Sequence, residues 1–419
     1  MSSLHLPTSR ALAITRSHPW AICGFNVDYS LFPVRISPRR ELGRRALGNV
    51  FKTFFDFPPG FLLSSPRVID TQEKLAAFLP VVRAADWIAV DTEADSLHAY
   101  PEKVCLIQIT TPAGDRLVDP LAALDVNALL AALSGHQLIM HGADYDLRLL
   151  FKHHRFTPTA IFDTMIAARL LGRRQFGLSS LVEDMLGIKL DKGPQKADWA
   201  RRPLTERMET YARNDTHHLR PLAQRLTADL AEKHRLDWHR ESCARLIADC
   251  TPPPPDDSDT VWRLKGSARL SRVGLAVVRA LWQWREAEAK AANRPPFFIL
   301  PHEKLVALAD AASVRQDVES LLPRHLSPRR REGIAQVIKA ALLQLAEAHP
   351  QIVRNFIRRP SESERRRYHG LEVRRDAAAH QLGLDATLIA SRAVLGDLAR
   401  DWDKHAPELM NWQRQLLQP

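Results

Sequence analysis

The sequence predicts an α/β domain with a mixed β-sheet, followed by all-helical modules. Short apolar strands alternate with helical patterns between residues 87 and 171, and a tight turn separates two of these strands. Beyond residue 260 the apolar residues recur at helical spacing only. Strands that alternate with helices pair in parallel, whereas a tight turn joins antiparallel strands, so we expect a mixed sheet.

The elements of this domain follow one another closely. Periodic structure begins near Val68, and the continuously apolar run 87–90 is typical of a strand buried on both faces. Strands over 104–110 and 116–118 flank the turn sequence Thr-Pro-Ala-Gly-Asp and form a hairpin. Further strands are expected over 138–140 and 160–162, and helices over 144–153, 164–171 and 204–230.

Composition divides the chain further. The segment Cys-Thr-Pro-Pro-Pro-Pro-Asp-Asp-Ser-Asp at 250–259 reads as a linker, because prolines stiffen it and acids keep it in water. After it, amphipathic helical stretches cover 270–292, 301–312, 333–348 and 380–398. We therefore expect a basic N-terminal arm over 1–65, the α/β domain over 66–250, the linker over 251–260, and helical modules over 261–345 and 346–419.

Charge and cysteine content limit the classes of partner. Of the 419 residues, 59 are Lys or Arg and 48 are Asp or Glu, a formal net charge of +11 that suits a polyanion. No apolar run approaches the roughly 18 residues that a membrane helix needs, and the four cysteines lack zinc-site spacing. We expect a cytoplasmic, monomeric protein with reduced thiols and no membrane partner. The acid-poor composition of the arm 1–65 overlaps with that of organelle transit peptides. A disordered basic arm, or a gene start placed too far upstream, would explain the segment as well.

Carboxylates gather at three points of the predicted α/β domain. Asp91 and Glu93 follow the buried strand at period two, so both should point to one side of the sheet. Two neighbouring carboxylates there are costly unless a cation lies between them, although a solvated strand end would explain them as well.

The other two points lie on predicted helices. Asp146 lies just inside a helix start, where Asp144 takes the N-cap position, and is the better ligand candidate of the two. Tyr211 and Asp215, four residues apart, share one helix face, which taken alone is an ordinary surface pair. Asp91, Glu93, Asp146 and Asp215 together form an all-oxygen set that suits two Mg²⁺ or Mn²⁺ ions, about 3.5–4 Å apart, clamping the attacking and leaving oxygens of a phosphodiester.

The order of these motifs resembles the DEDD exonuclease superfamily in its tyrosine-containing branch, and within it the ribonuclease D family. The matching segments are Asp91-Thr-Glu93, Val104-Cys-Leu-Ile-Gln108-Ile, His141 to Asp146, Phe162-Asp163-Thr164, Asp198-Trp199 to Pro203, and Tyr211 to Asp215. The resemblance covers roughly residues 68–235. It implies a ribonuclease H-like fold and a 3′→5′ exoribonuclease that removes nucleoside 5′-monophosphates from RNA 3′ ends. The resemblance also suggests tRNA precursors and other small structured RNAs as substrates.

The resemblance also implies roles for single residues. The four carboxylates would bind the two metal ions, Tyr211 would stand on the general-base side of the reaction, and Thr92 would touch the terminal nucleotide. The region beginning at Trp262-Arg-Leu-Lys265 resembles a helicase-and-ribonuclease-D C-terminal (HRDC) domain, and a fainter likeness around Gly383 to Arg392 suggests a second.

A loop before the third motif carries cations and one aromatic residue. Lys192, Lys196 and Arg201 could contact phosphates, and Trp199 could either stack on a base or anchor the loop in the domain. Asp163, at a helix start, is expected to be a buried cap rather than a ligand. The arginine runs 329–331 and 365–367 are either part of the nucleic-acid footprint or solvated faces.

Two other functions remain as alternatives. A DNA 3′→5′ exonuclease would use the same carboxylates, and the residues around Trp199 and Pro203 favour RNA over DNA by resemblance. A non-catalytic nucleic-acid-binding scaffold would have lost a ligand, but all four carboxylates and the tyrosine are present.

Overall fold

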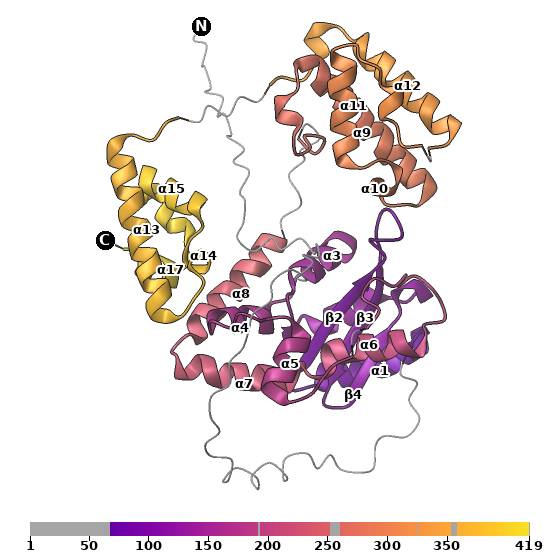
Figure 1. Cartoon of the computed structure of the whole chain (residues 1–419). Helices are drawn as coiled ribbons and strands as arrows, with labels where there is room; N and C mark the ends of the chain where they lie inside the picture. Colours follow the sequence, from indigo (N-terminus) through magenta and orange to yellow (C-terminus); the bar gives the residue numbers. More distant parts are fainter. Residues whose placement is uncertain (1–67, 192, 252–259, 325, 353–357, 419) are drawn as a thin grey trace, which may run out of the picture. The chain divides into compact units, whose positions relative to one another are not determined.

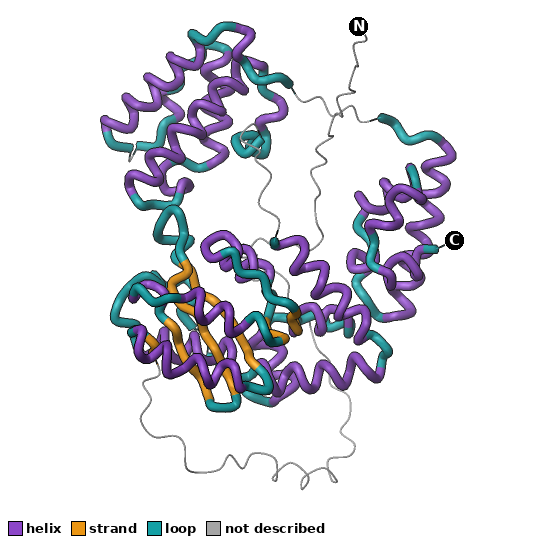
Figure 2. The backbone as a smooth tube through the Cα atoms, turned by 180° about the vertical axis from the view of Figure 1, so that it is seen from behind, coloured by secondary structure: helices purple, strands orange, loops and turns teal. Residues whose placement is uncertain are grey.

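The computed structural model describes residues 68–191, 193–251, 260–324, 326–352 and 358–418. The expected N-terminal arm 1–65, most of the linker 251–260 and Lys192 lie outside the described residues. All strands of the described residues belong to the first part of the chain, and only helices and loops follow (Figure 2).

A six-stranded mixed sheet forms the centre of the α/β domain, in the order β1-β4-β3-β2-β5-β6. The three strands β2, β3 and β4 pair antiparallel, whereas β1 joins β4, β5 joins β2 and β6 joins β5 in parallel. This arrangement confirms the predicted mixed sheet and its hairpin. The strands are β1 (Val68–Ile69), β2 (Ile88–Ala94), β3 (Val104–Thr111), β4 (Gly114–Val118), β5 (Gln137–Met140) and β6 (Ala160–Asp163).

Helices cover both faces of the sheet and extend from its β6 edge. Figure 1 shows α6 running across β2 and β3, and it packs on β4 as well. The helices of this domain are α1 (Gln72–Ala84), α2 (Val126–Leu133), α3 (Asp144–His154), α4 (Thr164–Leu170), α5 (Leu178–Leu186), α6 (Glu206–His217), α7 (Leu219–Glu232) and α8 (Leu236–Cys250). β3 is buried along its whole length.

Two groups of helices follow the linker. In the first, α9, α11 and α12 surround a core that includes Trp262, Leu281 and Ile334. In the second, α14, α15 and α17 pack on α13. The helices are α9 (Arg272–Ala292), α10 (Pro296–Ile299), α11 (His302–Ser313), α12 (Pro328–Leu342), α13 (Glu362–Leu382), α14 (Ala386–Ile389), α15 (Arg392–Arg400), α16 (Trp402–His405) and α17 (Asn411–Leu417).

Three expectations about helices were wrong in detail. The stretch 204–230 is two helices that meet at His218, because Pro221 lacks the N–H that would continue the ladder of α6. The stretch 380–398 is interrupted because Gly383 takes a left-handed conformation, with φ of 64°, and ends α13. α12 begins earlier than residue 333, with Ser327 as its cap and Pro328 in its first turn.

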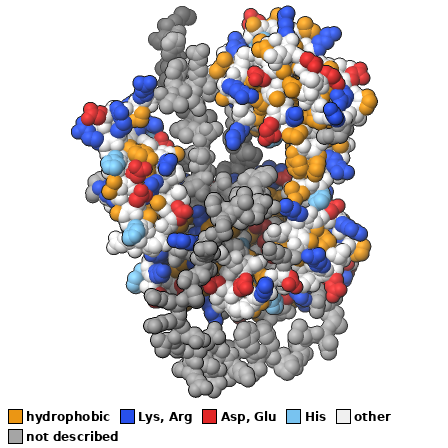
Figure 3. All heavy atoms as spheres, in the orientation of Figure 1, with side chains coloured by type: hydrophobic (Ala, Val, Ile, Leu, Met, Phe, Trp, Pro, Cys, Tyr) orange, Lys and Arg blue, Asp and Glu red, His pale blue; other side chains and the backbone are white. Residues whose placement is uncertain are grey.

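The charged side chains of the helical modules are mixed in sign. Figure 3 shows Lys and Arg interspersed with Asp and Glu over these modules, on the face in view. In the first arginine run, Arg329 and Arg330 pair with Glu288, and Arg331 pairs with Glu319. These pairs favour the interpretation of this run as a solvated, ion-paired face.

Candidate metal centre

The first two carboxylates come from the central strand β2. Asp91 and Glu93 are separated by one residue, and in the antiparallel pairing they lie opposite Gln108 and Leu106 of β3. Cross-strand partners share a face of the sheet, so both acids project toward the side that α6 covers. The register shifts between Glu93 and Ala94, directly after the second acid.

The helix α6 brings a third carboxylate and the tyrosine to this face. Thr205 caps the helix, accepting a hydrogen bond from the N–H of Met208, and the buried Met208 and Ala212 anchor the helix. Carboxylate oxygens of Asp91, Glu93 and Asp215 lie within 4.8 Å of one another. Two residues from one strand and one from a helix more than a hundred positions later therefore meet at one point.

The fourth carboxylate, Asp146, sits in the first turn of α3. Its Oδ1 accepts a hydrogen bond from the backbone N–H of Thr92 at 3.1 Å and another from the Thr92 hydroxyl. Thr92 is itself buried, with 7 % of its surface exposed. The structure thus places Thr92 between the two acids of β2 and against the acid of α3.

The start of α3 is fixed from two sides. Asp163 Oδ2 accepts the N–H of Ala143 at 2.8 Å, while its Oδ1 accepts the N–H groups of Met165 and Ile166 at the start of α4. Asp163 is therefore the buried helix cap that the sequence predicts, and it also ties α4 to the helix that carries Asp146.

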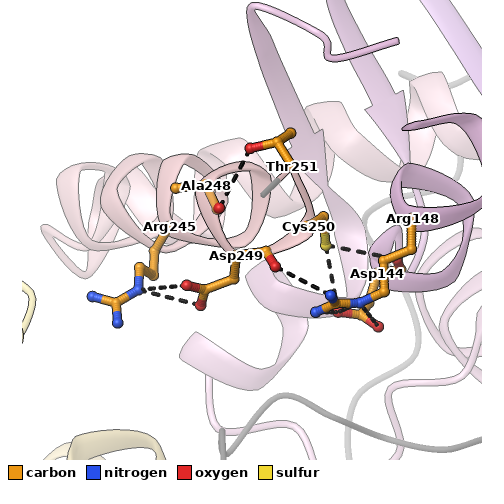
Figure 4. A network of polar contacts seen from close by, with 7 residues as sticks. All are labelled: Asp144, Arg148, Arg245, Ala248, Asp249, Cys250 and Thr251. Carbon is orange, nitrogen blue, oxygen red and sulfur yellow. Dashed lines mark hydrogen bonds and ion pairs between the residues drawn. The ribbon is translucent and has the colours of Figure 1, made fainter. Parts of the chain in front are cut away.

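The second side is a polar network with the end of α8. Asp144 is not the helix cap that was expected, because Ala143 takes that position and Asp144 is the first helical residue. Figure 4 shows the Asp144 carboxylate facing Arg148 and Cys250. Arg148 also donates to the backbone carbonyl of Asp249, at 3.1 Å. The network therefore holds the outer face of α3 on α8.

Burial and mutual repulsion shape the electrostatics of this site. Burial, followed by the charges of Asp215 and Asp146, raises the pKa of Glu93 to about 9. Burial first, then the neighbouring acids, raises the pKa of Asp91 well above its usual value, and burial also raises the pKa values of Asp146 and Asp215. Among the described residues no cation is paired with Asp91, Glu93 or Asp215. Such a set of buried oxygen ligands fits a divalent cation, whose charge relieves the repulsion.

Tyr211 lies on α6 one turn before Asp215, as predicted. Its pKa is raised by burial and then by the charge of Asp215, so the phenol keeps its proton at neutral pH. The ring packs in one cluster with Trp199 and Leu106, and its centroid is 6.0 Å from that of Trp199. Tyr211 is thus a partly buried neighbour of the acids and not a surface residue.

The loop before α6 holds the other candidate substrate residues. Trp199 is 1 % exposed and belongs to the cluster beneath Tyr211, so its burial favours the interpretation as a loop anchor and leaves no ring face open for a base. Lys196 and Arg201 are exposed, and the Lys196 carbonyl oxygen lies 3.0 Å from His98 Nε2. Lys192 lies outside the described residues.

Two residues near the acids were not assigned a role from the sequence. Gly193 lies so close to Tyr211 that a Cβ there would overlap three carbons of the ring. Gln108 is a polar residue in the middle of the otherwise apolar stretch from Val104 to Ile109, and it is completely buried. The sequence alone shows that a single amide interrupts an apolar strand, but only the fold shows which residues lie beside it.

Comparisons with known proteins identify the family to which the chain belongs. A family model described as 3′-5′ exonuclease matches residues 66–231, and one described as HRDC domain matches residues 274–318. The sheet, the helix α6 and the cluster of acids lie within the first match, so the class of protein that the fold and site define is a 3′→5′ exonuclease.

Similar proteins narrow this class. Ribonuclease D of Gluconacetobacter diazotrophicus is 30 % identical over 357 residues, which cover 83 % of this chain and 90 % of that protein. Ribonuclease D of Zymomonas mobilis is 37 % identical over 247 residues, which cover 58 % of this chain and 63 % of that protein. The crystal structure of Escherichia coli RNase D, an exoribonuclease involved in structured RNA processing, matches with a TM-score of 0.67 and 25 % identity. The match covers 84 % of this chain and 96 % of that one.

The chain belongs to the ribonuclease D family. It is accordingly a 3′→5′ exoribonuclease, and RNA is its substrate. This assignment decides against the alternatives of a DNA exonuclease and of a non-catalytic scaffold. Among the described residues, no helix combines the length and the apolar composition that crossing a bilayer requires.

Proposed function

We propose that Asp91, Glu93, Asp146 and Asp215 bind two Mg²⁺ or Mn²⁺ ions and that the site releases nucleoside 5′-monophosphates one at a time. The observation that carries this proposal is the convergence of carboxylate oxygens of Asp91, Glu93 and Asp215 within 4.8 Å of one another, while no Lys or Arg of the described residues forms an ion pair with them. Divalent ions held there supply Lewis acidity toward the attacking and leaving oxygens of a phosphodiester.

The remaining steps belong to the chain's own residues. Tyr211, which keeps its proton, orients the attacking water by a hydrogen bond rather than by removing its proton. Thr92 fixes the carboxylate of Asp146 by donating hydrogen bonds from its hydroxyl and its N–H. Its contact with the terminal nucleotide is therefore made by atoms other than these two donated protons. Lys196 and Arg201, both exposed in the loop before α6, contact backbone phosphates of the RNA. Lys192 is assigned the same role from the sequence alone.

We further propose that the natural substrates are 3′ ends of tRNA precursors and other small structured RNAs in the cytoplasm. The E. coli relative, whose described role is structured RNA processing, supports this choice of substrate. We propose that the protein acts as a monomer, as expected from the sequence. For the domain boundaries we retain those expected from the sequence. The exonuclease domain covers 66–250, and two HRDC-type modules cover 261–345 and 346–419.

The experiment uses one RNA in two forms, labelled at its 5′ end to follow its shortening and labelled uniformly to identify the released mononucleotides, and each is digested by the full chain. We expect EDTA to abolish hydrolysis and added Mg²⁺ or Mn²⁺ to restore it, with a ladder shortening from the 3′ end and 5′-monophosphates as products. Asp91→Ala should lose orders of magnitude in kcat while RNA binding survives, because the ions stabilise charge in the transition state. A phosphate on the 3′ end of the RNA should block the reaction.

Two kinds of outcome would contradict these proposals. Full activity of Asp91→Ala, or cleavage of a circular RNA, would contradict the proposed mechanism. A tRNA precursor that is cut no better than an unstructured RNA would contradict the proposed substrate.

A further inference from the structure

The middle of β3 contains a buried side-chain amide, that of Gln108. Gln108 is completely buried, and neither its Oε1 nor its Nε2 has a hydrogen-bond partner among the described residues. Because both atoms are unpaired, this holds whichever way the amide group is turned. Buried polar groups nearly always find partners in native proteins, so an unpaired one requires a reason.

The direction of Gln108 follows from its neighbours on the strand. Leu106 and Thr110, two residues away on either side, share its face of the sheet. Leu106 packs in one cluster with Ala212 of α6, and the Thr110 hydroxyl forms a hydrogen bond with the hydroxyl of Thr216, with an O···O distance of 2.8 Å. Gln108 therefore faces α6 between these two contacts, at the turn of the helix that carries Asp215.

The pairing of the strands brings Gln108 to the acids. Gln108 lies directly opposite Asp91 in the antiparallel register of β2 and β3, and directly opposite partners place their side chains next to each other on one face. Asp91 is one of the three residues whose carboxylate oxygens converge. The unpaired amide and the candidate ligand are thus cross-strand neighbours.

An amide suits this position for a chemical reason. An ionised carboxylate only accepts hydrogen bonds, and an amide NH₂ can donate to it. A Lys or Arg would donate as well, but its positive charge would repel a divalent cation held by the same carboxylate. A neutral donor orients the ligand without this repulsion, as groups behind metal ligands commonly do.

We propose that Gln108 is a positioning residue of the metal centre, whose side-chain amide donates a hydrogen bond to Asp91 when the acids are ionised around cations. This inference rests on the proposed function of Asp91 as a metal ligand. It gives a reason for the buried amide within the otherwise apolar stretch 104–109 of β3.

The test compares two substitutions on the same face of β3. Gln108→Leu removes the amide and keeps a similar volume. Thr110→Val instead removes a hydroxyl that has two hydrogen-bond partners, Thr216 Oγ1 at 2.8 Å and Asp115 Oδ1 at 2.9 Å. The measurements are the melting temperature of the metal-free protein, the affinity for Mn²⁺ by calorimetry, and RNA hydrolysis as a function of Mn²⁺ concentration.

We expect opposite patterns. Gln108→Leu should melt at the wild-type temperature or above, because an unpaired buried amide is replaced by an apolar group, and should bind Mn²⁺ about tenfold more weakly. Thr110→Val should melt lower and bind Mn²⁺ as the wild type does. If the leucine variant does not fold, Gln108→Met provides the same comparison.

Wild-type Mn²⁺ affinity in Gln108→Leu would overturn the inference, and so would a loss of melting temperature equal to that of Thr110→Val without a change in Mn²⁺ binding. Asp91→Asn separates this failure from a failure of the proposed ligand set. If Asp91→Asn loses Mn²⁺ binding and Gln108→Leu does not, only the role of Gln108 is wrong. If Asp91→Asn binds Mn²⁺ normally, the ligand assignment is wrong.

Discussion

Thr92 donates two hydrogen bonds to one oxygen of Asp146, one from its backbone N–H at 3.1 Å and one from its hydroxyl. The two residues are 54 positions apart, one on β2 and the other on α3. Because both bonds end on Oδ1, the other oxygen of Asp146 remains available as a ligand. The hydrogen bonds to Thr92 also lower the pKa of Asp146 and so oppose the larger effect of burial.

Thr92→Val should weaken metal binding while leaving the backbone bond to Asp146 in place. The loss of one hydrogen bond to a charged group costs about 1.5–3 kcal/mol, which corresponds to a roughly tenfold or larger loss of Mn²⁺ affinity. Calorimetry with Mn²⁺ measures this effect, and Thr92→Ser, which keeps the hydroxyl, is the control. Equal Mn²⁺ affinity in the valine and serine variants would show that the hydroxyl does not hold Asp146.

Tyr211→Phe should lower kcat by roughly ten- to a hundredfold and leave metal affinity nearly unchanged, because it removes a positioning hydroxyl and no ligand. Asp215→Asn, four residues on along the same helix face, should weaken Mn²⁺ binding itself. Titrating Mn²⁺ into both variants while following RNA hydrolysis separates the two roles. A wild-type rate for Tyr211→Phe, or the same loss of metal affinity in both variants, would mean that Tyr211 is only structural.

Gly193→Ala should reduce kcat because its Cβ would overlap the ring of Tyr211 and force the ring or the loop to move. A displacement of about 1 Å at a catalytic group can cost on the order of a hundredfold in rate. Gly177→Ala is the matched control, since a Cβ there has no heavy atom within 4 Å. The comparison is made on kcat with saturating RNA, and equal activity of the two variants would argue against a close contact between the loop and Tyr211.

The metal-free protein should become less stable as pH rises. Burial raises the pKa of Glu93 from 4.5 to about 9, and the pKa values of Asp91 and Asp215 are raised in the same direction. The folded state then binds more protons than the unfolded chain between about pH 4 and pH 9, so this contribution to stability is present at low pH and is lost as pH rises through that window.

Melting temperatures between pH 5 and pH 9, measured with EDTA and with Mn²⁺, test this expectation. The rise in melting temperature caused by Mn²⁺ should grow with pH, because the ion binds the ionised acids and displaces protons. In the variant Glu93→Gln the pH dependence of the metal-free protein should be smaller. A metal-free protein whose stability rises over this range would contradict the direction of these pKa shifts.

Much of the architecture could be predicted from the sequence because its signals are local. The apolar run before Asp91 predicts a buried strand, and the turn sequence between β3 and β4 predicts a hairpin. Each of these patterns is complete within a few consecutive residues. The helix ends were less predictable, since Pro221 and Gly383 interrupt stretches whose apolar spacing continues past them.

The sequence by itself determined which chemical groups are present: four carboxylates with hard oxygen atoms, a phenol four residues before one of them, and the order of motifs that marks the family. Only the tertiary structure decided which of these groups meet and what stands behind them. It buries Trp199 under Tyr211, turns Thr92 toward Asp146, and sets Gln108 opposite Asp91. These relationships join residues distant in the chain, so they depend on strand register and on how α3 and α6 pack against the sheet, and no local pattern specifies either.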